Sequence, residues 1–110
     1  MDKQKSILYD IQYACELILQ YTDEFELETF RADVLRQDAV QRRLAIIGEA
    51  SNKLDDDFKK QHPEVPWSVM RGMRNRLVHT YNEIDIDLVW TTITNDIPVL
   101  IDHIKRLISD

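Results

Sequence analysis

The residues of this 110-residue sequence that are best suited to chemistry lie between Trp67 and Tyr81. At about 100° per residue on a helical wheel, this segment separates into two sides. The apolar side holds Met70, Met73, Leu77 and Tyr81. The polar side holds Ser68, Arg71, Gly72, Asn75 and His79, with Arg74 at the border. The spacing therefore predicts a core-facing stripe and, opposite it, a polar groove with a glycine floor.

Arginine, asparagine and histidine on one side of a helix suit phosphodiester chemistry. A guanidinium holds a phosphate through two hydrogen bonds, and an imidazole exchanges protons near neutral pH. His79 is the natural proton carrier of this set. The alternative is a solvated helix face, or a helix end at which His79 only complements the dipole. Spacing alone does not decide between these interpretations.

Other candidate sites are less convincing. Asp55, Asp56 and Asp57 could imitate a magnesium site, but adjacent acids point in different directions and usually form a solvated turn. His62 and His103 stand alone, without metal-ligand spacing, so we expect surface residues. No nucleophile motif or phosphate-binding glycine loop is present. We therefore predict no metal site and no cofactor, and we expect both tryptophans to pack in the core.

Apolar residues recur at helical spacing along most of the chain. The pattern predicts a helix over residues 3–21, a shorter helical piece ending near Arg36, and a long helix from Gln37 to Leu54. Gly48 lies inside that long helix, where a glycine allows another helix to approach closely. Pro66 marks the start of a helix over residues 67–78.

The final predicted helix follows two acidic cap candidates, Asp85 and Asp87. It contains Pro98, which removes a backbone hydrogen bond and predicts a kink. No convincing strand is present. Together these segments predict an all-α fold, an up-and-down bundle of four to five helices in a single domain over residues 1–110.

Composition restricts the environment and the ligands. The net charge is -6, which opposes general nucleic-acid binding, so contact with RNA depends on the local cations Arg71, Arg74 and Arg76. The lone Cys15 excludes an internal disulfide and is expected in the core. No signal peptide and no apolar run of about 18 residues is evident. We therefore expect a cytoplasmic protein without a membrane segment.

The segment Arg74-Asn75-Arg76-Leu77-Val78-His79-Thr80-Tyr81 carries the pattern Arg-x4-His-x-Tyr, with asparagine after the arginine. On this motif the chain resembles the HEPN superfamily, specifically the HepT-like ribonuclease toxins. The similarity covers almost the whole chain. It includes Tyr21-Thr22, Phe30 with Asp33, Ala39-Val40, Ile47-Gly48-Glu49-Ala50, Val65-Pro66-Trp67, Asp85 and Val89-Trp90. Thr80 occupies the variable position, where some relatives carry glycine.

The resemblance implies a HEPN-like bundle with Arg74 and His79 as catalytic residues and Asn75 as their support. It also implies a homodimer that places two copies of the motif across one cleft. The implied activity is a metal-independent endoribonuclease that acts as the toxin of a toxin–antitoxin system. Tyr81 would be the tyrosine to which a partner antitoxin, a minimal nucleotidyltransferase, transfers AMP. Arg71 and Arg76 would add substrate-binding charge.

Two other functions remain open at the level of sequence. The first is a HEPN module that has kept the motif but binds nucleotide or a nucleotidyltransferase partner without catalysis. The second is a bundle whose main role is assembly, with the polar groove used for protein contacts. Replacing His79 separates them, because only the enzyme hypothesis requires loss of RNA cleavage with folding and partner binding retained.

Overall fold

The computed structural model describes residues 2–74 and 85–110. Within these ranges the chain is helical and contains no strand. None of the described helices is long and apolar enough to cross a membrane.

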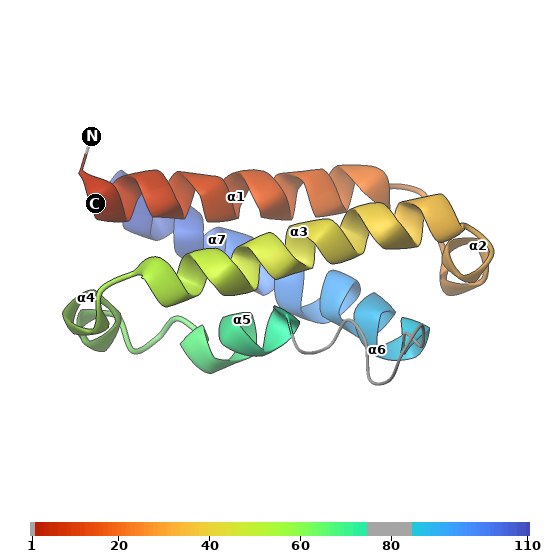
Figure 1. Cartoon of the computed structure of the whole chain (residues 1–110). Coiled ribbons are helices and arrows are strands. Elements are labelled where there is room, and N and C mark those ends of the chain that lie inside the picture. Colours follow the sequence, from red (N-terminus) through yellow and green to blue (C-terminus); the bar gives the residue numbers. More distant parts are fainter. Residues whose placement is uncertain (1, 75–84) are drawn as a thin grey trace.

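Two long antiparallel helices form one side of the molecule (Figure 1). Helix α1, Lys3–Tyr21, begins after Asp2, whose carboxylate accepts the backbone N–H of Lys5 at 2.9 Å. Helix α3, Val34–Lys53, begins after Asp33, which caps Arg36 N–H at the same distance of 2.9 Å. A side-chain oxygen at this position satisfies an amide that has no partner within the helix, which is why both helices begin there. The predicted helix over residues 3–21 is confirmed.

The prediction that a short helical piece ends near Arg36 is wrong. Helix α2 covers only Leu27–Arg31, and α3 starts at Val34, three residues earlier than predicted. The cap at Asp33 divides the apolar run into two helices. Val34 and Leu35 resemble core residues in sequence, but their exposed fractions are 64% and 82%.

Helix α4, Asp56–Gln61, was not predicted. Its sequence has no apolar stripe, and none of its residues is buried. The three aspartates interpreted as a turn lie at its start, with Asp55 at the N-cap and Asp56 and Asp57 in the first turn. Negative charge in this place complements the helix dipole, which explains the cluster without a metal ion.

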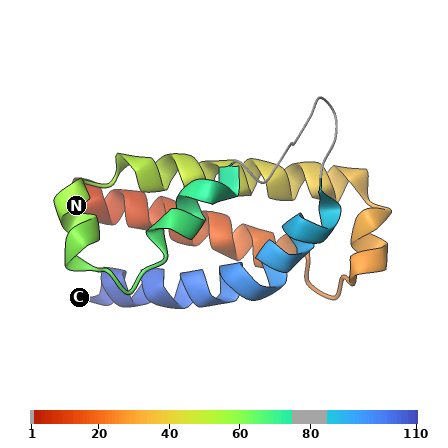
Figure 2. The same cartoon turned by 90° about the horizontal axis from the view of Figure 1, so that it is seen from below.

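Helix α5, Trp67–Met73, follows Pro66 as predicted, and Arg74 continues it in helical conformation as the C-cap. The predicted end of this helix, at residue 78, lies outside the described residues. The predicted final helix is divided into α6, Ile86–Thr91, a π-helical turn η2, Thr92–Asp96, and α7, Ile97–Ser109. Pro98 lies in the first turn of α7, so the regular helix is interrupted just before the proline, and α6 and α7 run in different directions (Figure 2).

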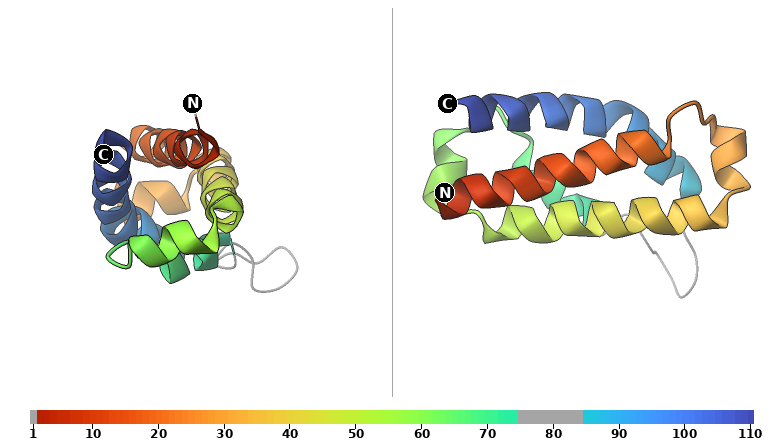
Figure 3. Two further views of the ribbon diagram at one scale, coloured as in Figure 1. Left: turned by 90° about the vertical axis from the view of Figure 1, so that its left-hand side faces the viewer. Right: turned by 90° about the horizontal axis from the view of Figure 1, so that it is seen from above.

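The bundle has up-and-down topology, and the N- and C-termini lie at the same end (Figure 1). Helix α1 packs against α3 and α7, and α3 packs against α1 and α5. Viewed along the bundle, α1, α3, α5 and α7 surround one interior (Figure 3). That interior contains the predicted stripes, including Ile11, Ile18, Val40, Leu44, Ile47, Ile97, Leu100 and Ile104, all fully buried. The all-α bundle is therefore confirmed.

Candidate active site

Helix α5 is fixed to the bundle by its apolar side. Met70 and Met73 are fully buried, as the helical wheel predicts. At the start of the helix, the indole Nε1–H of Trp67 donates to the carbonyl oxygens of Lys59 at 3.1 Å and His62 at 2.9 Å. The polar side of α5 consequently faces away from the core. Trp67 and Trp90 both pack against the core, as predicted.

The structure places part of the predicted polar groove on this outer side. Ser68, Arg71 and Arg74 are exposed, and Gly72 is half-buried. A Cβ atom at Gly72 would meet no atom of residues 2–74 and 85–110 within 4 Å, so these residues leave the predicted glycine floor open. Asn75, Arg76, His79 and Tyr81 were also predicted to belong to this site, and they lie outside the described residues.

Arg74 lies directly against α3, where the helix contains Gly48. A Cβ atom at Gly48 would lie 3.0 Å from the Cβ of Arg74 and 3.3 Å from its backbone nitrogen. It would also lie 3.4 Å from the carbonyl oxygen of Met70. The predicted close approach at Gly48 is therefore confirmed. The sequence did not predict which residue approaches Gly48. In the structure that residue is Arg74, the arginine of the motif.

The arginines of α5 differ in their ion pairing from the arginines at the other end of the bundle. Arg31 pairs with Asp87, and Arg36 donates to Asp33 at 3.3 Å and to the Tyr21 carbonyl at 2.6 Å. Arg71 and Arg74 form no ion pair with any residue in the ranges 2–74 and 85–110. Within the described part of the chain, their guanidinium groups are therefore available to an anion such as a phosphate.

The elements on both sides of the motif are anchored. Helix α5 precedes it, and α6 follows it with Asp85 as N-cap, accepting Leu88 N–H at 3.0 Å. The predicted role of Asp85 as a cap is confirmed. Asp87 lies in the first turn of α6, as predicted. Since both flanking helices are fixed, Arg74 is presented from a rigid framework rather than from a long loop.

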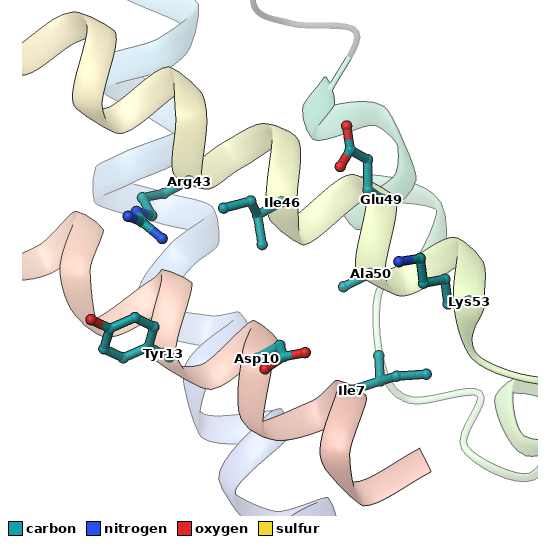
Figure 4. Close-up of a pocket in the computed structure, with 8 residues that line it drawn as sticks. All are labelled: Ile7, Asp10, Tyr13, Arg43, Ile46, Glu49, Ala50 and Lys53. Carbon is teal, nitrogen blue, oxygen red and sulfur yellow. The ribbon is translucent and has the colours of Figure 1, made fainter. Parts of the chain in front are cut away.

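A hollow of about 340 Å³ lies between α1 and α3 (Figure 4). Two cations, Arg43 and Lys53, and two carboxylates, Asp10 and Glu49, line it. The guanidinium of Arg43 lies 5.9 Å from the ring centroid of Tyr13. These charges balance, so the hollow offers no excess of positive charge to a polyanion. We therefore place the candidate site at α5.

The remaining titratable candidates are buried or half-buried. Burial of Cys15, and secondarily the charge of Glu16, raises the pKa of the thiol to about 12, so this residue is core as predicted. His62 is half-buried, in contact with the Phe58 ring at a centroid distance of 4.8 Å. His103 is also half-buried, so the two histidines are less exposed than the expectation of surface residues implies. The residues described by the structure contain no group of three potential metal ligands.

Comparison with known proteins identifies the family. The model of the family described as "Ribonuclease HepT-like" matches residues 11–107. The chain belongs to the HepT-like ribonuclease family. It therefore belongs to the HEPN superfamily, and the predicted membership is confirmed. The prediction of an RNA-cleaving enzyme is also confirmed, at the level of the family.

Individual relatives agree over nearly the whole chain. The protein named "Probable ribonuclease HepT" of Thermococcus cleftensis is 45% identical over 103 residues, which cover 94% of each chain. A "Putative RNase" of Methanocaldococcus jannaschii is 35% identical, over 96% of this chain and 88% of its own. A "Putative RNase" of Caldanaerobacter subterraneus is 32% identical, over 99% of this chain and 97% of its own. No solved structure gives a significant match.

Proposed function

We propose that this HepT-like protein is a metal-independent endoribonuclease that uses Arg74 and His79. The ribose 2′-oxygen attacks the adjacent phosphorus and loses its proton to a general base, while the bond from phosphorus to the 5′-oxygen breaks. A general acid then gives a proton to that leaving oxygen. His79 takes one of these proton-transfer roles, and Arg74 stabilises the charge on the phosphate. Asn75 supports them, and Arg71 and Arg76 contribute binding charge.

The observation that carries this proposal is the placement of Arg74. It is exposed, it forms no ion pair with a described residue, and its backbone is held against α3 at Gly48. An arginine whose backbone is fixed and whose guanidinium pairs with no described residue suits charge stabilisation, because a preorganised donor needs no reorganisation during the reaction. The family membership provides the reaction class.

Cleavage assays on single-stranded RNA test the proposal. We expect cleavage in the presence of EDTA and products with 2′,3′-cyclic phosphate ends, since the proposed steps use only proton transfer and charge stabilisation. Arg74→Ala and His79→Ala should each abolish cleavage while the helical circular-dichroism spectrum is unchanged. Strict dependence on magnesium, or an active double variant, would refute the mechanism. Partner binding that survives in an inactive His79→Ala protein excludes simple unfolding as the cause.

We further propose a homodimer that packs along α5 and the final helices and places two motifs across one cleft. Two copies would supply two histidines for the two proton transfers and would double the local arginine density against the net charge of -6. A hollow of about 140 Å³ between α5 and α7 supports this face as an interface. It is lined by Pro66, Val69, Met73, Asn95, Asp96, Val99 and Leu100. Val99 has an exposed fraction of 54%, which is high for an apolar residue of this bundle.

Light scattering at micromolar concentration tests the dimer. A monomer that retains full specific activity on further dilution would exclude a shared cleft. A dimer whose specific activity falls on dilution below its dissociation constant would support it.

We propose that the protein is the toxin of a toxin–antitoxin system and that Tyr81 is its control point. The family resemblance supports a minimal nucleotidyltransferase as partner. The Tyr81 oxygen would attack the α-phosphorus of ATP, form an O–P bond, lose its proton and release pyrophosphate. On a continued helix Tyr81 stands about two turns after Arg74. The attached AMP would therefore bring a negative charge and a nucleoside close to that arginine.

Incubation with the partner and ATP tests this control. We expect a mass increase of one AMP per modified site, its location at Tyr81 by peptide analysis, and loss of RNA cleavage. Absence of modification, or modification that is unchanged in Tyr81→Phe, would show that the assignment is wrong.

A further inference from the structure

We propose that Gly48 is a positioning residue for Arg74. The lack of a side chain at Gly48 lets the end of α5 lie against α3 at the separation that sets the position of the Arg74 guanidinium. The inference rests on the proposed function in one respect, the catalytic role of Arg74. The packing itself is independent of that role.

The contact is made with the backbone and Cβ of Arg74 rather than with its flexible guanidinium end. A methyl group at Gly48 would lie 3.0 Å from the Arg74 Cβ and 3.3 Å from the Arg74 backbone nitrogen. Non-bonded carbon atoms prefer separations of about 3.5–4.0 Å. A side chain at Gly48 therefore requires Arg74 to give way by a few tenths of an ångström. Rotating the guanidinium would not relieve the overlap, because the atoms concerned are the Cβ and the backbone.

Neither helix can easily absorb that movement elsewhere. On α3, the neighbouring Ile47 is fully buried, and the Ser51 hydroxyl donates to the Gly48 carbonyl at 2.9 Å. On α5, Met70 and Met73 are fully buried, and Trp67 is fixed by two hydrogen bonds. Arg74 is the C-cap of α5 and is exposed. The displacement would consequently fall on Arg74, whose Cβ and backbone nitrogen are the atoms that the added methyl group would contact.

A small displacement of a charge-stabilising group has a large effect on rate. Misplacement of a catalytic group by about 1 Å can reduce activity about 100-fold. Alanine also has a higher helix propensity than glycine, so the substitution favours α3 itself. Gly48→Ala is thus expected to change activity without an equivalent loss of stability, which a merely structural role would not do.

The first test compares Gly48→Ala with Asn52→Ala. Asn52 is exposed, one turn further along α3, and it forms no side-chain hydrogen bond within the described residues. We expect Gly48→Ala to lower kcat for RNA cleavage by about 5- to 10-fold, because the displacement is a fraction of 1 Å. KM and the melting temperature should stay close to those of the parent protein. Asn52→Ala should retain parental kcat. A parental kcat in Gly48→Ala would overturn the proposal.

The second test asks whether the effect acts through Arg74. Arg74→Lys keeps the backbone and the Cβ but replaces the rigid guanidinium by a flexible ammonium group. In this background the loss caused by Gly48→Ala should shrink to less than about 3-fold, because contacting residues are coupled. An equal loss in both backgrounds would show that Gly48 acts generally on the fold, and would overturn the assignment to Arg74.

A spectroscopic readout separates failure of this inference from failure of the proposed function. The 15N–1H signal of Arg74 Nε, assigned by its loss in Arg74→Lys, should shift in Gly48→Ala and not in Asn52→Ala. This measurement does not require cleavage. If wild-type protein cleaves no RNA but the signal shifts, the proposed function fails and the packing relationship holds. If cleavage depends on Arg74 but neither kcat nor the signal responds to Gly48→Ala, only the positioning role fails.

Discussion

The rings of Phe30 and Trp90 lie 5.3 Å apart, centroid to centroid, and are tilted by 37°. This contact joins α2 to α6, and the hydrogen-bonded pair of Arg31 and Asp87 joins the same two helices at the surface. Helix α6 directly follows the motif segment in sequence. The connection between α2 and α6 therefore fixes one of the two elements that flank the candidate active site.

Phe30→Ala should destabilise the protein strongly. Phe30 is fully buried, so the substitution removes apolar contacts and leaves a cavity beside Trp90. We expect a loss of about 3–5 kcal/mol in the free energy of unfolding, measured by urea titration with circular dichroism. Phe30→Leu keeps most of the volume and should cost less. A loss below about 1 kcal/mol for the alanine variant would show that the aromatic contact is not a significant anchor for α6.

Asp33→Ala should destabilise the protein, because it removes the N-cap of α3. The carboxylate of Asp33 accepts the Arg36 backbone N–H at 2.9 Å, and its ion pair with Arg36 is partly exposed. The cap accounts for about 1 kcal/mol and the ion pair for less. We therefore expect a loss of about 1–2 kcal/mol in unfolding free energy for Asp33→Ala. Asp33→Asn retains a cap acceptor, so a loss in that variant equal to the alanine loss would assign the effect to charge.

Cys15 should be unreactive in the folded protein. Burial, followed by the charge of Glu16, raises the pKa of its thiol to about 12, and the thiolate is the nucleophile. We expect no alkylation by iodoacetamide at pH 8 in the native protein and complete alkylation in denaturant. Rapid native labelling would contradict the burial of this side chain.

The same shift predicts a pH dependence of stability at alkaline pH. The folded-state pKa of Cys15 lies above the unfolded value of about 8.5, so the unfolded chain loses its proton first. The contribution to stability is complete below that value and declines as the pH rises through the interval up to about 12. The difference between wild type and Cys15→Ala in unfolding free energy from pH 8 to 11 isolates the cysteine, and a constant difference would refute the prediction.

The main helices were predictable because their apolar residues repeat at the spacing of one buried helix face. Helix α4 was missed because it has no such face, and its N-terminal aspartates also occur in turns. The boundary at Asp33 was missed for the opposite reason. Val34 and Leu35 continue the apolar pattern, although in the fold they are exposed at the start of α3. Periodicity therefore identifies helices that bury a face and fails where helix capping decides the boundary.

The candidate site was predictable only within its own helix. A helical wheel places Arg71 on the polar side, away from Met70 and Met73, and Arg74 at the border, and in the structure both arginines are exposed. A wheel contains no information on which other helix approaches. The sequence indicated that something packs closely on Gly48, but the identity of that neighbour depends on the arrangement of α3 and α5 in three dimensions.

The final prediction concerns Gly72 and self-association. A methyl group at this position meets no described residue of the same chain within 4 Å, and Gly72 lies inside α5. Gly72→Ala should therefore stabilise the isolated monomer by up to about 1 kcal/mol through helix propensity. If α5 forms the proposed interface, the added methyl group would instead obstruct the close approach of a second copy. We expect a melting temperature that rises at low protein concentration and a dimer dissociation constant at least about tenfold weaker, which corresponds to about 1.4 kcal/mol.

Sedimentation equilibrium of wild type, Gly72→Ala and the control Asn52→Ala provides the measurement. An unchanged dissociation constant in Gly72→Ala would place the dimer contact elsewhere on the bundle, because a close-packed interface could not accept the extra carbon without a cost.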